Sequence, residues 1–152
     1  MNRAAGLPSI VSCNCLAARE TVVRFRVDEG DGPAMARILV AEDDQFTREM
    51  VQRALKTDGH DVIAVEDGSE ALKLCDDVYA FDLIVTDVEM PNMSGLSLAE
   101  AVIAKNAGQR IIIMSALAEE LARARALLSP TFKMLTKPVT LEQIRGETAE
   151  IL

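Results

Sequence analysis

The sequence is poor in aromatic residues, histidine and cysteine. Its 152 residues include no Trp, one Tyr, four Phe, one His and three Cys. Two of the cysteines, Cys13 and Cys15, form a C-x-C pair, but neither a second pair nor a neighbouring His supplies the four ligands of a structural zinc site. We therefore interpret the cysteines as the reduced thiols of a cytoplasmic protein.

Several features that define whole functional classes are also absent. No apolar run approaches the roughly 20 residues of a membrane-spanning helix, and the N-terminal segment lacks the apolar core of a signal peptide. The chain has neither a G-x-x-x-x-G-K-S/T phosphate loop nor a G-x-G-x-x-G dinucleotide turn. Its 24 Asp and Glu exceed its 16 Lys and Arg, and this acidic balance repels nucleic acid. We expect a cytoplasmic protein that has no membrane or nucleic-acid partner and binds no nucleotide itself.

The first 34 residues differ from the remainder of the chain. They show no sustained hydrophobic periodicity and close on the loop-like sequence DEGDGP, after which MARILVAEDD has the pattern of a new start. We interpret residues 1–34 as an N-terminal extension that is disordered or non-native, with an isolated strand at ETVVRFRV as an alternative. Residues 35–152 are long enough for one domain with a single well-filled core.

From Met35 onward, short apolar runs alternate with amphipathic stretches. This alternation predicts β-α units around a parallel sheet, with right-handed crossovers that place helices on both faces. The expected fold class is therefore α/β, a doubly wound five-stranded parallel sheet with five helices. The expected strands are residues 37–41, 61–66, 81–87, 110–116 and 131–137, and each is followed by an expected helix.

The helices are recognised by apolar residues at helical spacing and by their terminal signals. In the first helix, Phe46 belongs to an apolar face that continues to Leu55. The second helix is predicted to open on a Ser69 cap and the third to end at Gly108. The fourth, residues 118–128, is rich in Ala and thin in large apolar side chains, so we expect it to pack less firmly.

Polar residues gather where the predicted strands end. The first strand is followed by Glu42 and Asp43, the third ends in Asp87, the fourth in Ser115 and the fifth in Lys137. Because the carboxyl ends of parallel strands form one edge of the sheet, these side chains are expected at the crevice where ligands bind. Taken singly, each also has an ordinary explanation as a helix cap, a loop residue or a surface charge.

Converging carboxylates need a cation to compensate their repulsion. Two like charges about 4 Å apart repel by roughly 4 kcal/mol at an effective dielectric constant near 20. Mg²⁺ uses one or two protein carboxylates and keeps positions for water and phosphate oxygens. We therefore predict that Asp43 and Asp87 bind Mg²⁺ directly and that Glu42 contributes through water. Asp87 could then attack a phosphoryl group while Ser115 and Lys137 hold the transferring oxygens.

These residues, in this order, resemble the receiver domain of two-component response regulators. The resemblance rests on ILVAEDD, DLIVTDVEMPNMSG, IIIMSA and LTKP, and it spans residues 36–152. It implies a flavodoxin-like fold with strand order 2-1-3-4-5 and a cis Lys-Pro bond. It also implies that Asp87 is the phosphoacceptor, that Glu42 and Asp43 are the acidic pair, and that the backbone carbonyl of Glu89 is a further Mg²⁺ ligand.

The same resemblance makes Ser115 the switch hydroxyl and Lys137 the lysine of the site. Two positions depart from the family pattern, because Met134 stands where receivers usually have Tyr or Phe and Val139 replaces a frequent Phe. A Met can change rotamer and fill a gap left by Ser115, but it has no ring or hydroxyl to expose as a signal. We therefore expect Met134 to occupy the switch position without the usual aromatic readout.

Only 11 residues follow Leu141, so we expect a stand-alone receiver. Its MARILVAEDD and DGHDVIAVEDGSEAL segments are similar to the small alphaproteobacterial cell-cycle regulators that control substrate delivery to the ClpXP protease. The resemblance implies a phosphorelay in which a histidine kinase or a histidine phosphotransfer protein is the donor. It also implies a downstream protein target, for which the similar cell-cycle regulators suggest the ClpXP protease. The resemblance further implies self-phosphorylation and self-dephosphorylation rather than enzyme turnover.

Two other functions stay open. A phosphorylation-independent interaction module would keep the fold and use Met134 and the acidic pocket structurally. A haloacid-dehalogenase-like phosphatase would use Asp87 as its nucleophile, but such enzymes carry a second Asp two residues later, where this chain has Glu89. Steady turnover of a generic phosphate ester would favour the phosphatase, whereas indifference to a phosphate mimic would favour the interaction module.

Overall fold

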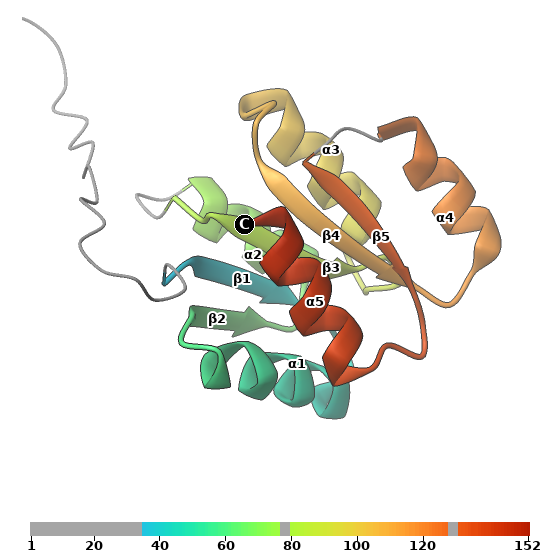
Figure 1. The fold of residues 1–152 in the computed structure, drawn as a ribbon. Coiled ribbons are helices and arrows are strands. Elements are labelled where there is room, and N and C mark those ends of the chain that lie inside the picture. Colours follow the sequence, from blue (N-terminus) through green and yellow to red (C-terminus); the bar gives the residue numbers. More distant parts are fainter. Residues whose placement is uncertain (1–34, 77–79, 128–130) are drawn as a thin grey trace, which may run out of the picture. The chain divides into compact units, whose positions relative to one another are not determined.

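The computed structural model describes residues 35–76, 80–127 and 131–152 of the chain (Figure 1). The predictions made for residues 1–34, including those for Cys13 and Cys15, lie outside the described residues. Within the described ranges each predicted strand and helix is present, although several boundaries differ.

The five strands of the described chain form one parallel sheet, which confirms the predicted fold class. Their order, β2-β1-β3-β4-β5, is the flavodoxin-like order 2-1-3-4-5 that the resemblance implies. The strands are short and mostly buried, as expected for a parallel sheet covered on both faces. They are β1 (Arg37–Ala41), β2 (Asp61–Val65), β3 (Leu83–Asp87), β4 (Arg110–Ser115) and β5 (Phe132–Thr136).

Helices cover both faces of this sheet (Figure 1). Apolar residues of α1 and α5 pack on one face, and those of α2, α3 and α4 pack on the other. None of the helices described is long and apolar enough to cross a membrane. The helices of the described ranges are α1 (Gln45–Thr57), α2 (Gly68–Asp76), α3 (Gly95–Lys105), α4 (Ala118–Ala124), the 3-10 helix η1 (Arg125–Leu127) and α5 (Leu141–Ile151).

The helix starts are stabilised by local side-chain acceptors. Asp44 accepts the backbone N–H of Thr47 at 2.8 Å at the start of α1, directly after the predicted acidic pair. At α2 the prediction of a Ser69 cap is wrong. Asp67 is the acceptor, and its Oδ1 receives both the backbone N–H and the hydroxyl of Ser69, at 2.6 and 2.8 Å. An ionised carboxylate is a stronger acceptor than a Ser hydroxyl, and hydrogen bonds to it are charge-assisted.

Two predicted helix ends also differ from the structure. α3 ends at Lys105 rather than at Gly108, because the backbone of Asn106 is extended. The side-chain oxygen of Asn106 accepts the N–H of Gly108 at 3.1 Å. α4 gives way to a 3-10 helix after Ala124, which is fully buried. The short helix agrees with the expectation that this segment, thin in large apolar residues, packs less firmly.

Phe46 does not belong to the buried face of α1, contrary to the prediction. Its exposed fraction is 77%, whereas Val51 and Leu55 are fully buried. At about 100° per residue, Phe46 lies about 140° from Val51 and about 180° from Leu55 around the helix axis. The side chain of Phe46 therefore lies on the face of α1 that is turned away from the sheet.

Candidate acidic site at the sheet edge

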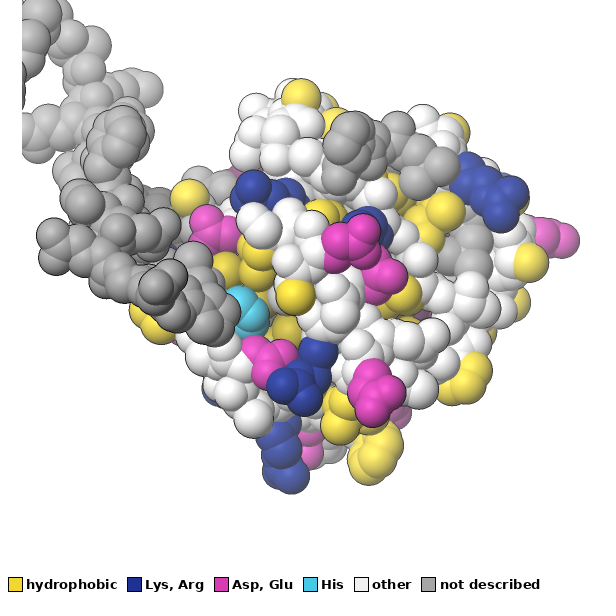
Figure 2. Space-filling view, in the orientation of Figure 1, with side chains coloured by type: hydrophobic (Ala, Val, Ile, Leu, Met, Phe, Trp, Pro, Cys, Tyr) yellow, Lys and Arg dark blue, Asp and Glu magenta, His cyan; other side chains and the backbone are white. Residues whose placement is uncertain are grey.

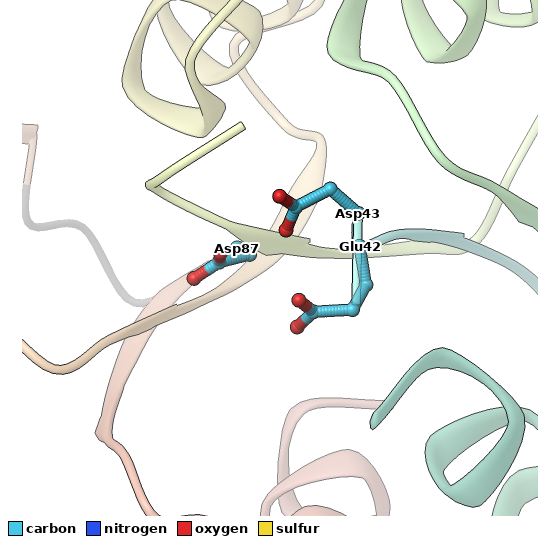
Figure 3. Close-up of side chains that lie close together, drawn as sticks. All are labelled: Glu42, Asp43 and Asp87. Carbon is cyan, nitrogen blue, oxygen red and sulfur yellow. The ribbon is translucent and has the colours of Figure 1, made fainter. Parts of the chain in front are cut away.

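The acidic residues predicted from the strand ends lie together at the carboxyl edge of the sheet. β1 and β3 are neighbours, so Glu42 and Asp43, which follow β1, lie beside Asp87, the last residue of β3. One carboxylate oxygen from each residue lies within 4.8 Å of the other two. Figure 3 shows the three carboxylates pointing to the same side of the strand ends. Three negative charges are therefore within reach of one small cation.

Two of these acids are buried and one is exposed. The exposed fractions of Glu42 and Asp87 are 0% and 2%, whereas Asp43 faces solvent. Burial raises the pKa of Glu42 to about 7, and hydrogen bonding to Lys137 offsets only part of this effect. Burial also raises the pKa of Asp87 against the opposing effect of Lys137. Both buried acids therefore hold a proton more tightly than ordinary carboxyl groups, unless a further cation stabilises their charge.

Lys137, which follows β5, is the cation of the site. Its Nζ lies 3.0 and 3.2 Å from the two carboxylate oxygens of Glu42 and donates hydrogen bonds to both. It also lies 3.0 Å from Oδ1 of Asp87. Burial opposes its charged form, but the two carboxylates outweigh this effect and raise the pKa of Lys137. The peptide bond between Lys137 and Pro138 is cis, as the resemblance implies.

The contact of Lys137 with Asp87 is an ion pair without the geometry of a hydrogen bond. Oδ1 of Asp87 is buried and has no hydrogen-bond partner among the described residues. One ammonium group contacts two of the three carboxylates, so negative charge at the site is only partly balanced. A buried carboxylate oxygen that has only an ion-pair contact, together with an excess of carboxylate oxygens, fits a hard cation such as Mg²⁺.

Ser115 lies at the end of β4, next to β3 in the sheet, and is fully buried. Its hydroxyl accepts the backbone N–H of Leu117 at 3.0 Å. Its carbonyl accepts the backbone N–H of Lys137 at 2.9 Å, which joins the ends of β4 and β5. The predicted hydroxyl and the predicted lysine are thus held at the same edge as the acids.

The side chains of the other two predicted site residues do not belong to the cluster of three carboxylates. Met134 is within β5, opposite Ile113, and is half-buried against the core that also holds Ala124 of α4. Glu89 lies in the loop after Asp87 with its side chain exposed. Their proposed roles depend on a rotamer change and on a backbone carbonyl, respectively, and stay predictions.

The loop after Asp87 requires a glycine at position 95. A Cβ at Gly95 would lie 2.0 Å from the carbonyl oxygen of Asp87, far inside a van der Waals contact. The backbone N–H of Gly95 donates to the carbonyl of Val88 at 3.1 Å, and the N–H of Val88 donates to Met114 at 2.9 Å. These contacts hold the start of α3 directly against the end of β3.

Sequence reasoning missed Arg48 of α1. Its Nη1 donates to the backbone carbonyls of Glu42 and Asp43, at 2.7 and 3.1 Å. Helix side chains lean toward the N-terminus, so an Arg one turn after the Asp44 cap can reach the turn that precedes the helix. That spacing was the available signal.

Comparisons with known proteins match this geometry. A family model described as the response regulator receiver domain matches residues 38–149. The chemotaxis protein CheY of Treponema pallidum is 29% identical over 136 residues, which cover 86% of this chain and 93% of that protein. The transcriptional regulatory protein YrkP of Bacillus subtilis, described as uncharacterized, is 32% identical over 110 residues, 72% of this chain. The chain spans only 46% of YrkP.

The fold is also similar to solved structures. The crystal structure of the response regulator TrrA from Thermotoga maritima, in complex with Mg(2+)-BeF, superposes with a TM-score of 0.70. It is 27% identical in sequence, and the match covers 78% of this chain and 100% of that chain.

Proposed function

This chain belongs to the response regulator receiver domain family, and we propose that it accepts a phosphoryl group from a phosphohistidine donor on Asp87 and thereby switches its protein interactions. The observation that carries the proposal is the convergence of Asp87, Glu42, Asp43 and Lys137 at one edge of the sheet. The match to nearly the whole of a chemotaxis CheY supports a signalling role for this receiver.

Mg²⁺, when bound, would neutralise the carboxylates and the oxygens of the incoming phosphoryl group. We assign Asp43, Asp87 and the backbone carbonyl of Glu89 as its protein ligands, with Glu42 contributing through water. Oδ1 of Asp87, which has an ion-pair contact but no hydrogen bond, and the Mg(2+)-BeF complex of TrrA support this assignment. Glu42 also carries both hydrogen bonds from Lys137, which would hold that ammonium beside Asp87.

In the transfer, a carboxylate oxygen of Asp87 forms a bond to phosphorus while the bond from phosphorus to the donor's imidazole nitrogen breaks. The imidazole leaves with the electron pair of that bond, and the product is an aspartyl phosphate. Lys137 and the hydroxyl of Ser115 would pair with the phosphoryl oxygens as negative charge develops on them. Hydrolysis of the aspartyl phosphate would restore the Asp87 carboxylate. The chain would thus alternate between a phosphorylated and an unphosphorylated form.

The switch would begin at Ser115. Its hydroxyl accepts the N–H of Leu117 at 3.0 Å, just before α4, and donation to a phosphoryl oxygen would draw it away from that contact. Met134 would then change rotamer to fill the vacated space, in place of an aromatic switch. The surface formed by α4, β5 and α5 would change with it, and a partner would be gained or lost.

We extend the proposal to the partners that the resemblance implies. The donor would be a histidine kinase or a histidine phosphotransfer protein in a cytoplasmic phosphorelay. The target would be a protein in regulated proteolysis, such as the ClpXP protease, as in the cell-cycle regulators with similar motifs. In this proposal residues 35–152 form the receiver domain and residues 1–34 are an extension outside it.

Intact-mass spectrometry after incubation with acetyl phosphate tests the central step. We expect the gain of one phosphoryl mass that requires Mg²⁺ and is lost in Asp87→Asn. Asp82→Asn is a matched control, because Asp82 precedes the same strand at its opposite end and accepts the N–H of Arg37. Equal modification of the Asp87→Asn variant would assign the acceptor elsewhere.

The two alternative functions give different results in the same preparation. A chain that gains no mass under any condition would favour the phosphorylation-independent module, in which the acidic pocket and Met134 are structural. Steady hydrolysis of a phosphate ester without accumulation of a modified chain would favour the phosphatase that uses Asp87 as nucleophile. A single stable modification is expected from the receiver.

A further inference from the structure

Arg48 binds the backbone of the acidic turn rather than an acidic side chain of the site. Its Nη1 donates to the carbonyl of Glu42 at 2.7 Å and to that of Asp43 at 3.1 Å. Its other terminal nitrogen lies 3.8 Å from a carboxylate oxygen of Glu66, after β2. Only 18% of the Arg48 side chain is exposed, whereas Glu66 is largely exposed. The guanidinium therefore connects α1 to the turn after β1 within a mostly desolvated environment.

Consecutive carbonyls held by one rigid donor fix the peptide plane that follows Glu42 and both peptide planes that flank Asp43. Glu42 points inward, fully buried, to Lys137, while Asp43 faces solvent beside Asp87. The two adjacent side chains differ in burial although their carboxylates lie within 4.8 Å, and this arrangement depends on the backbone of the turn. Hydrogen bonds from a charged donor are roughly twice as strong as neutral ones, so Arg48 is a strong constraint on that backbone.

We propose that Arg48 is a positioning residue for the cation site, which holds Glu42 and Asp43 in the orientation that lets them share one ion with Asp87. This inference rests on the proposed function, because it concerns the same site. Residues that orient metal ligands without touching the metal typically change its affinity by about 10- to 100-fold when removed.

The charge of Arg48 makes the direction of the change in Mg²⁺ affinity informative. A positive charge near the site opposes the binding of a cation, so its removal should strengthen Mg²⁺ binding if Arg48 acts only through its charge. Loss of a positioning contact should instead weaken binding. The two effects of one substitution therefore have opposite directions.

Isothermal titration calorimetry of the full chain with Mg²⁺ measures this direction. We expect Arg48→Ala to raise the dissociation constant about 10-fold. Arg48→Lys keeps the charge and one donor group without the planar fork, so we expect a smaller rise, about threefold. Arg53→Ala is the charge-matched control on the same helix, because Arg53 is exposed and outside the site, and it should bind Mg²⁺ as tightly as the unsubstituted chain.

Urea unfolding of the same variants separates positioning from general stability. Arg145→Ala removes an ion pair with Asp58, which lies beyond the C-terminus of α1, and should lower stability without changing Mg²⁺ affinity. If Arg48→Ala does not fold, weaker binding by the folded Arg48→Lys variant still supports the positioning role, because its charge is unchanged.

Two results overturn the inference in distinguishable ways. Mg²⁺ binding by Arg48→Ala that is as tight as, or tighter than, that of Arg53→Ala would leave the proposed function intact and remove the role of Arg48. Failure of the unsubstituted chain to bind Mg²⁺ would overturn the proposed function, and the role of Arg48 with it.

Discussion

Replacing Asp87 by Asn should stabilise the metal-free protein, although it removes the proposed acceptor. The carboxylate has a favourable contact with Lys137 at 3.0 Å and unfavourable ones with Glu42 and Asp43 within 4.8 Å. At an effective dielectric constant near 20 the first is worth about 5.5 kcal/mol and each of the other two about 3.5 kcal/mol, so charge pairing alone disfavours the ionised acid by about 1.5 kcal/mol. Burial of the ion adds a cost in the same direction.

The raised pKa of Asp87 leads to the same conclusion, because it means that the folded protein favours the neutral carboxyl group over the carboxylate. Asn is a neutral group of the same shape, so it removes the net charge repulsion. We therefore expect the free energy of unfolding to rise by about 1–2 kcal/mol. The effect should be largest above about pH 7, where Glu42 is ionised.

Urea unfolding followed by far-ultraviolet circular dichroism measures this difference, since the chain has no Trp for fluorescence. With a chelator, Asp87→Asn should be more stable than the unsubstituted chain. With Mg²⁺ at 10 times its dissociation constant, the unsubstituted chain should gain about 1.4 kcal/mol and the difference should shrink. Glu100→Gln removes an exposed charge of α3 as a control. A metal-free Asp87→Asn variant that is less stable than the unsubstituted chain would refute the reasoning.

Three further predictions follow from other contacts. Mg²⁺ affinity should rise with pH until about pH 7, because Glu42 must release its proton, and Glu42→Gln should flatten this dependence in calorimetric titrations. Gly95→Ala should lower the free energy of unfolding by about 3 kcal/mol in urea, because its Cβ would collide with the carbonyl of Asp87. The Arg145 guanidinium lowers the pKa of Asp58, and this ion pair therefore stabilises the fold above the ordinary Asp pKa. The stabilisation is lost as the pH falls through the lowered pKa. In acid unfolding, Arg145→Gln should therefore lose less stability between these two pH values.

The fold was predictable because the strands are strongly patterned. Runs such as those ending at Ala41 and Asp87 are nearly continuous in apolar residues, and a parallel sheet covered on both faces requires this pattern. The strand order came from the family resemblance, since alternation of strands and helices allows several orders. The structure confirms both.

Helix details were less predictable, because they depend on competing local contacts. Phe46 lies in the first turn of α1, where an apolar residue at helical spacing looks like a core residue until the exact rotation of the helix is known. Ser69 is a good cap in isolation, but the preceding Asp67 accepts its hydrogen bonds instead. Gly108 was expected at the end of α3, whereas the extended backbone of Asn106 ends that helix earlier.

The acids of the site were predictable from the sequence, whereas the role of Arg48 was not. Position after a strand suffices to bring Glu42, Asp43 and Asp87 to one edge of a parallel sheet. Arg48 lies within a helix, and its partners are backbone carbonyls that every residue possesses. The spacing of Arg48 from the Asp44 cap is a weak signal on its own, and the folded geometry was needed to identify the carbonyls as its partners.

The site combines a rigid frame with one weakly satisfied group. Glu42 receives two hydrogen bonds from Lys137, and the backbone on either side of the site is held by Arg48 and by the close contact at Gly95. Asp87 is buried, yet Oδ1 has only an ion-pair contact. A bound cation would compensate the charge of Asp87 and of the acids around it, Glu42 included. We expect the change to reach the contacts next to the site, of which the hydrogen bond between Ser115 and Leu117 at the start of α4 is one.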